Sequence, residues 1–208
     1  MIFGLALSVG AITLVSSPPT NVGGIENDVA TFGFSFFILI TIWLRYTRIM
    51  SVLPLQSQRV VNLNIILLFL VSLEPFFFNI VNNPPSLVTD PGAYGDATST
   101  MYALDIAAMM FILGFFTLTV ADEERKLIPK ELVRQFKRES AIWLITGCLY
   151  LVTVLPFFYT HYLDGIRLRY VLWIVPQIFI FASRASGRLA ARRRAAASAS
   201  EPVVPSRP

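Results

Sequence analysis

Two acidic residues, Glu74 and Asp105, lie inside long apolar segments of the sequence. An ionisable side chain at such a position is costly to bury and is therefore a candidate for function, for example in a proton or cation relay. A structural role is the alternative, in which the two carboxylates pair with Arg167 or Arg169, which are expected at the same level. We expect the structural pairing and keep the relay as the competing hypothesis.

The sequence offers little else for catalysis, because it contains one cysteine, Cys148, and one histidine, His161. A structural zinc site uses several Cys or His ligands, and a disulfide framework needs a set of cysteines. An enzyme would also need a nucleophile, a base or a metal cluster that converge in one pocket. We therefore predict that the chain is not an enzyme and that it uses no cofactor and no resident metal.

The elements that must position these side chains are apolar runs. Of the 208 residues, 55% are hydrophobic and 14% are charged, and the mean hydropathy is +0.63. This composition is too apolar for a soluble domain of this size. A membrane-spanning helix needs about 20 mostly apolar residues, with about 17 tolerated. The segments that approach or meet this length are 1–19, 29–44, 60–81, 101–121, 141–163 and 170–183.

The basic residues are distributed unequally between the two ends of these segments. All of them except Arg167 and Arg169 follow the second, fourth or sixth segment. Lys and Arg concentrate in cytoplasmic loops, so this pattern predicts an all-α, polytopic membrane protein with six transmembrane helices and both termini in the cytoplasm. The same pattern explains the net charge of +4 without a nucleic-acid partner.

The domain boundary is predicted from composition. Residues 1–184 form the transmembrane domain, and residues 185–208, which are rich in Ala, Ser, Pro and Arg, are predicted to form a disordered cytoplasmic tail. No Lys or Arg precedes Glu26, so the opening run lacks the basic region of a secretory signal and is expected to be a retained span.

Two connecting segments each allow two interpretations. The segment TDPGAYGD, residues 89–96, has some similarity to a carbonyl-lined selectivity filter, but Pro91 and Ala93 interrupt the motif and we expect an ordinary turn. The basic segment 130–139 could form an amphipathic surface helix. We expect a solvated connector there.

Short motifs in five of the six apolar segments have the order and spacing of one known family. On these motifs the chain resembles the transmembrane protein 175 family, the endosomal and lysosomal potassium channels and their prokaryotic relatives. The matching positions are Phe3, 11–14, Trp43, Arg48, Asn64, 72–73, 75–76, 102–105 and 171–176.

The resemblance implies a homotetramer of six-helix subunits in a lipid bilayer, whose first helices line a central potassium pore without a carbonyl filter. In the family a bulky aliphatic side chain on this helix forms the constriction, with a Thr nearby on the same face. Carried over by register, the constriction position is Gly10, the Thr is Thr13, and the next pore-facing position is Ser17. Spacings of three and four residues place these positions on one helical stripe. Gly10 has no side chain to exclude water, so Leu14 is the alternative residue for closing the pore.

The chain departs from the family where polar groups normally join the inner end of the first helix to its neighbours. The Ser and Asp that follow the Phe are replaced by Gly4 and Leu5, and two His of the second segment are replaced by Tyr46 and Thr47.

We predict a multi-pass, potassium-permeable cation channel in a prokaryotic cell membrane. Potassium ions and the lipid bilayer are its expected partners. Two other hypotheses stay open. One is a proton-coupled small-solute transporter that uses Glu74 and Asp105, and the other is a relative that has kept the scaffold and lost conduction.

Overall fold

The computed structural model describes residues 2–16, 22–53, 57–82, 88–122, 127–163 and 166–182. The labelled helices are α1 (Ile2–Ser16), α2 (Val22–Met50), α3 (Gln58–Asn82), α4 (Pro91–Val120), α5 (Lys130–Val152) and the single turn α6 (Phe157–Thr160). A short hairpin follows, made of β1 (Tyr162–Leu163) and β2 (Ile166–Arg167). It leads into one more apolar helix, Leu168–Ala182, which we call the last helix.

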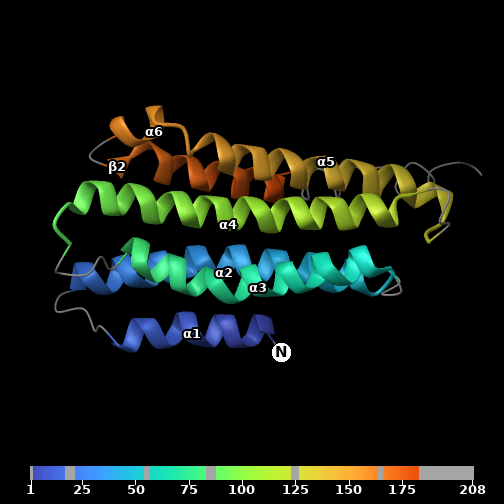
Figure 1. Cartoon of the computed structure of the whole chain (residues 1–208), viewed down its shortest axis with the longest axis horizontal. Helices are drawn as coiled ribbons and strands as arrows, with labels where there is room; N and C mark the ends of the chain where they lie inside the picture. The colour runs from blue at the N-terminus through green and yellow to red at the C-terminus, as the bar shows by residue number, and fades with distance from the viewer. Residues whose placement is uncertain are drawn as a thin grey trace, which may run out of the picture.

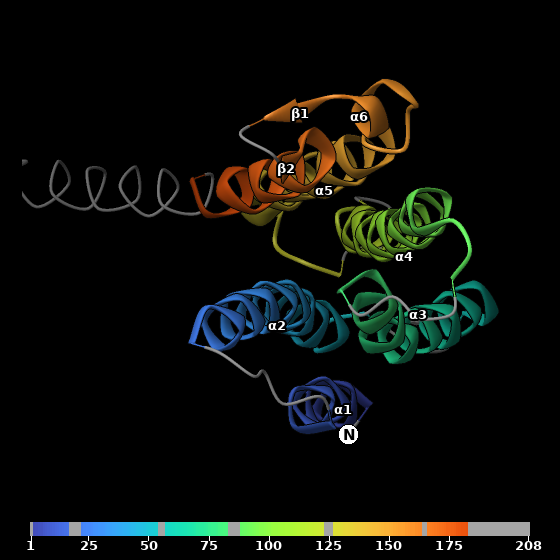
Figure 2. The ribbon, with the colours of Figure 1, turned by 90° about the vertical axis from the view of Figure 1, so that its left-hand side faces the viewer.

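The long helices lie side by side along the longest dimension of the molecule (Figure 1). Helices α2 and α3 form a layer between α1 and α4, and α5 with the last helix covers the opposite side of α4 (Figures 1 and 2). Helix α4 packs against both α3 and α5, whereas α1 packs against α3 and α2 only at the edge of the bundle. The core is therefore centred on α4, and α1 is the peripheral helix.

Three of the described helices, α2, α3 and α4, are long and apolar enough to cross a membrane, by length and composition. An all-α membrane protein, as predicted, agrees with this result. The complete set of six spans and the cytoplasmic position of both termini stay predictions, and the boundary at 184/185 and the tail lie outside the described residues.

The predicted span 141–163 is wrong in its limits. Helix α5 begins at Lys130 and ends at Val152, and residues 157–163 form α6 and β1 instead. Pro156 explains the end of α5, because proline has no N–H to donate and its ring clashes with the carbonyl one turn earlier.

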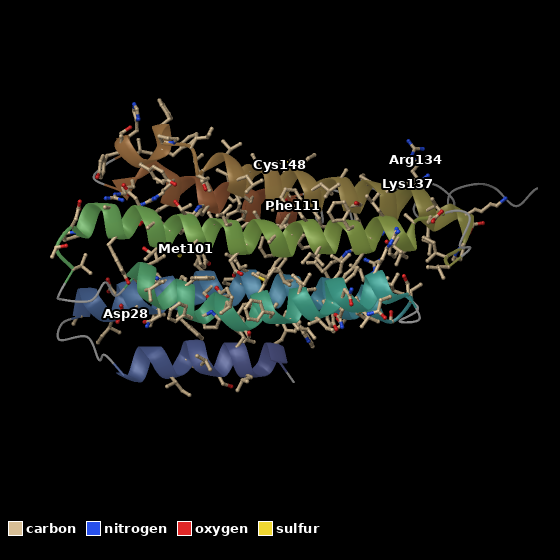
Figure 3. All side chains as sticks on the ribbon, viewed as in Figure 1. Asp28, Met101, Phe111, Arg134, Lys137 and Cys148 are labelled. Carbon is tan, nitrogen blue, oxygen red and sulfur yellow. The ribbon has the colours of Figure 1, made fainter. Side chains whose placement is uncertain are left out.

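The expectation of a solvated connector at 130–139 is also wrong, because these residues form the first part of α5. Val133 and Phe136, three residues apart, are buried on one face of the helix. Arg134 is exposed and points away from the bundle (Figure 3). Burial of the apolar face stabilises the helix here, as expected for an amphipathic segment.

Helix α4 begins within the segment that was compared with a filter. The Asp90 carboxylate accepts a hydrogen bond of 3.0 Å from the Ala93 N–H, and Pro91 occupies the first turn, where its missing N–H costs nothing. Residues 92–96 are helical, so their carbonyls are directed along the helix axis. The filter interpretation is therefore wrong, and the turn is confined to the residues before Pro91.

Two glycines allow α4 and α5 to approach closely. A Cβ atom at Gly114 would lie 2.8 Å from Cδ2 of Leu144, and one at Gly147 would lie 3.0 Å from the ring of Phe111. Phe111 lies between the two helices (Figure 3). The hydroxyl of Ser140 donates to the carbonyl of Gly114 at 2.9 Å, which joins the helices at the same level.

Candidate functional site

Helix α1 has one packed face and one open face. Phe3 and Ala6 are 6% and 4% exposed, whereas Leu5 and Ile12 are each 64% exposed and Val9 is 42% exposed. In an isolated soluble protein such a row of exposed aliphatic side chains would be unfavourable. The open face of α1 is therefore suited to lipid or to another protein surface.

The four predicted pore positions fall at the end of what the structure describes. Gly10, Thr13 and Leu14 belong to the backbone of α1, but their side-chain environments lie outside the described residues, and Ser17 lies outside them altogether. Their role as pore lining stays a prediction.

The N-terminal end of α1 is joined to α2 by an aromatic contact. The rings of Phe3 and Tyr46 have centroids 5.5 Å apart and are tilted by 37°. Tyr46 stands at one of the two positions where the family has a histidine. Thr47, at the other position, is exposed and donates to the Trp43 carbonyl of its own helix at 3.1 Å. One of the two replaced positions thus still contacts the first helix, through apolar packing.

A buried arginine on α2 connects three helices at the same end of the bundle. Arg45 is 5% exposed and forms an ion pair with Glu139 of α5, and its guanidinium donates to the Thr117 hydroxyl of α4 at 3.2 Å. It also lies over the ring of Phe136, 5.3 Å from the centroid. The sequence analysis did not find this site. An Arg near the end of an apolar run is a signal for it, but nothing in the spacing links it to Glu139.

At the opposite end of the bundle, Arg167 and Arg169 pair with a different residue from the ones expected. Arg167 of β2 and Arg169 of the last helix both form ion pairs with Asp96 of α4, the latter at 2.9 Å. Arg169 is 1% exposed and also donates to the Gly95 carbonyl at 3.1 Å. The expected pairing with Glu74 or Asp105 is therefore wrong. The hairpin places both arginines above the first turn of α4, beyond the depth of the two buried acids.

Arg167 lies outside the spanning helices, and its electrostatic environment favours the charged form. Partial burial on its own would lower the pKa of the guanidinium, but a hydrogen bond with Tyr162 and the negative charge of Asp96 outweigh it and raise the pKa. This Arg–carboxylate group therefore stays charged and fixes the hairpin to α4.

Glu74 and Asp105 lie on the packed faces of α3 and α4. They are 0% and 4% exposed. The Glu74 carboxylate accepts a hydrogen bond of 2.7 Å from the Ser35 hydroxyl of α2, and the Tyr102 hydroxyl lies 3.4 Å from the same oxygen. Asp105 lies three residues after Tyr102 on α4 and is therefore buried on the same face of that helix. The structure thus brings together the two acids that the sequence singled out.

Two side-chain hydrogen bonds join the last helix to the C-terminal end of α5. The Gln177 amide donates to the Tyr150 hydroxyl at 3.1 Å, and the Trp173 indole donates to the Thr153 hydroxyl at 3.1 Å. Trp173 also packs on Tyr102, with ring centroids 5.0 Å apart. These contacts link the last helix with the helix that carries Asp105. Within the described ranges, no three or more His, Cys, Asp or Glu side chains are grouped so that they could hold a metal ion.

The apolar spans and the packed helical layers define the class of the protein, an α-helical membrane protein. Residues 4–75 match the sequence model of the family described as endosomal/lysosomal potassium channel TMEM175. The fold is similar to the crystal structure of a lysosomal potassium-selective channel TMEM175 homolog from Chamaesiphon minutus. The TM-score is 0.56 at 16% sequence identity, over 88% of this chain and 92% of that chain. No match was found among curated protein sequences.

The two matches are independent of each other and agree. The sequence match covers α1, α2 and most of α3, and the structural match extends over nearly the whole chain. The resemblance to the TMEM175 family is therefore confirmed.

Proposed function

We propose that the chain is a subunit of a potassium-permeable cation channel and that several copies of α1 line its pore. The observation that carries the proposal is the open aliphatic face of α1, formed by Leu5, Val9 and Ile12, on a helix at the edge of the bundle. A helix with one side packed on its own subunit and the other side uncovered can meet its copies around an axis. The family match includes this helix.

The assembly that we propose is a homotetramer in a prokaryotic cell membrane, crossed by six helices of each subunit. Its pore has no carbonyl filter. The helical state of residues 92–96 supports this part of the proposal, because the one segment with similarity to a filter has its carbonyls inside α4. Permeation then depends on side chains along α1, and the ion moves down its electrochemical gradient without a cofactor.

The residues proposed to line the pore are Gly10, Thr13, Leu14 and Ser17. Positions 10 and 13 continue, by helical periodicity, the row of Phe3 and Ala6, whose side chains are buried against the subunit's own helices. Leu5 and Ile12 belong to the open row of α1. The row of Gly10 and Thr13 and the row of Leu5 and Ile12 are therefore alternative linings of the pore. The row with Thr13 offers a hydroxyl to the ion, whereas the row with Ile12 is the one with described exposure.

The test is potassium flux into liposomes that contain the purified protein, with the oligomeric state measured in the same preparation. We expect flux that follows the potassium gradient and needs no proton gradient. Uptake of a small solute that requires a proton gradient would instead indicate the transporter. The absence of flux from folded, tetrameric protein would contradict the channel and favour a relative that has lost conduction.

A further inference from the structure

The contact between α3 and α4 encloses two carboxyl groups whose oxygens are incompletely satisfied. Glu74 Oε1 accepts from Ser35, but among the described residues no hydrogen-bond partner reaches Glu74 Oε2 or either carboxylate oxygen of Asp105. Both side chains are at least nine-tenths buried. A buried carboxylate oxygen without a donor is strongly unfavourable if the group is charged.

The helices around the pair supply no described positive charge. The sequence of α1 has no ionisable side chain, and α2 contributes the hydroxyl of Ser35. The titratable groups that face Glu74 are Tyr102 from α4 and Tyr150 from α5, and neither carries a positive charge. From the hairpin and the last helix, Arg167 and Arg169 are directed to Asp96. At least one of the two negative charges must therefore be offset by something other than a described side chain.

A proton or a metal cation could supply the missing positive charge. Two carboxyl groups that share a buried site cannot both ionise at low cost, and the usual result is that one of them keeps its proton. A hard cation such as Ca²⁺ would need about six or more oxygen ligands, whereas a proton needs neither a coordination shell nor a cavity. The closed packing of the site favours the proton.

The hydrogen bonds around Glu74 and Asp105 differ, and this difference indicates which of the two carboxyl groups carries the proton. Glu74 has one short hydrogen bond from Ser35 and a longer approach from Tyr102, both of which stabilise a negative charge. Asp105 has neither. We infer that Glu74 and Asp105 form a proton-binding pair between α3 and α4, in which Asp105 carries the proton and Glu74 keeps the negative charge.

The inference predicts how stability depends on pH. The folded state holds a proton on Asp105 that the unfolded chain releases above about pH 4, the ordinary range of an aspartate. The folded state therefore binds more protons, and stability falls as the pH rises. For one proton the unfolding equilibrium constant of the wild type should increase by up to about tenfold per pH unit above that range.

The experiment compares unfolding of the full chain in detergent micelles from acid to alkaline pH, for the wild type, Asp105→Asn and Glu74→Gln. Asp105→Asn imitates the protonated state, so its profile should be flatter than that of the wild type. Glu74→Gln removes the repulsion but leaves Asp105 buried, so it should keep part of the slope. Glu131→Gln, which removes an exposed carboxylate on α5, is the control and should follow the wild type.

A second measurement avoids dependence on a variant that fails to fold. Infrared spectroscopy of the wild type at neutral pH should show the carbonyl stretch of a protonated carboxyl group, and Asp105→Asn should lack it. Absence of this band in the wild type overturns the inference. An unchanged pH profile in Asp105→Asn overturns it as well. So does stability that depends on calcium concentration at constant pH in the wild type and not in Asp105→Asn. None of these readouts requires conduction, so the outcome is independent of the proposed channel.

Discussion

Phe3 and Tyr46 place their rings 5.5 Å apart and thereby fix the N-terminal end of α1 against α2. Phe3 is buried and Tyr46 is half-buried, so the contact excludes solvent from part of the joint. The polar groups that the family uses at this end are replaced here by Gly4, Leu5, Tyr46 and Thr47. The aromatic contact joins the two helices at this end through packing of the two rings.

This contact predicts a measurable coupling between Phe3 and Tyr46. An aromatic pair of this geometry contributes about 0.5–1.5 kcal/mol beyond the area that it buries. Replacing either residue by Leu should lower the free energy of unfolding, and the double variant should cost less than the sum of the two single changes by about that amount. Additive effects in this double-mutant cycle would show that the rings do not interact.

The ion pair of Arg45 and Glu139 predicts a larger loss of stability than the Phe3–Tyr46 contact when one partner is removed. Removing one partner of a buried ion pair leaves a charge without compensation and costs about 3–5 kcal/mol. Glu139→Gln should therefore destabilise the protein strongly in chemical unfolding, because Arg45 is 5% exposed. The double change Arg45→Met with Glu139→Leu should recover part of the loss, since no unpaired charge remains.

Arg48 is the matched control for that experiment, because it contacts the same carboxylate from an exposed position. Its guanidinium lies 3.6 Å from Glu139, and its side chain is 52% exposed. Exposed ion pairs contribute about 0–1 kcal/mol. A loss from Arg48→Gln as large as that from Glu139→Gln would contradict the assignment of the stability to Arg45.

The sequence predicted the helical class well, because long apolar runs are the strongest signal available from residue types. It failed at the limits of the helices. Hydropathy separated the basic segment 130–139 from the apolar run 141–163, whereas Val133 and Phe136 are buried and extend α5 back to Lys130. It also missed that Asp90 caps α4 eleven residues before the apolar run, which begins at residue 101, since a cap depends on local backbone geometry rather than on hydropathy.

Side-chain pairing between helices was the weaker part of the prediction. Glu74 and Asp105 were found because an acid in an apolar run is conspicuous, but their expected partners Arg167 and Arg169 bind Asp96 instead. Which residues meet across two helices depends on rotation and on the level reached by the connecting hairpin. Neither of these follows from the spacing within one segment.

The close packing of α4 and α5 predicts opposite effects of two glycine substitutions. Gly114→Ala would place a methyl group 2.8 Å from Leu144, and overpacking of this kind costs about 1–3 kcal/mol. At Gly33 of α2 nothing lies within 4 Å of the added Cβ, so Gly33→Ala should raise stability by about 0.5–1 kcal/mol through helix propensity. Thermal unfolding of both variants measures the difference, and an equal response would contradict the close approach at Gly114.

The position of Gly10 predicts an effect on conduction if the proposed pore is correct. A bulky aliphatic side chain there would supply the missing constriction, so Gly10→Ile should reduce potassium flux. Ala11→Ile introduces the same side chain one residue further along, about 100° away on the open face of α1, and should leave the flux largely unchanged if the row of Gly10 faces the pore axis. A selective loss of flux in Ala11→Ile would reverse the proposed orientation of the helix.

Cysteine accessibility separates the two rows of α1 directly. The chain has a single cysteine, Cys148, which is exposed, so a Cys148→Ser background is needed before Thr13→Cys and Ile12→Cys are introduced one at a time. A charged thiol reagent that does not cross membranes can reach a side chain in a hydrated pore but reacts poorly with one in lipid. We expect the reagent to block flux through Thr13→Cys and to spare Ile12→Cys. Block of Ile12→Cys alone would assign the pore to the row with Leu5, because adjacent helical positions differ by about 100° in direction and cannot both face one narrow axis.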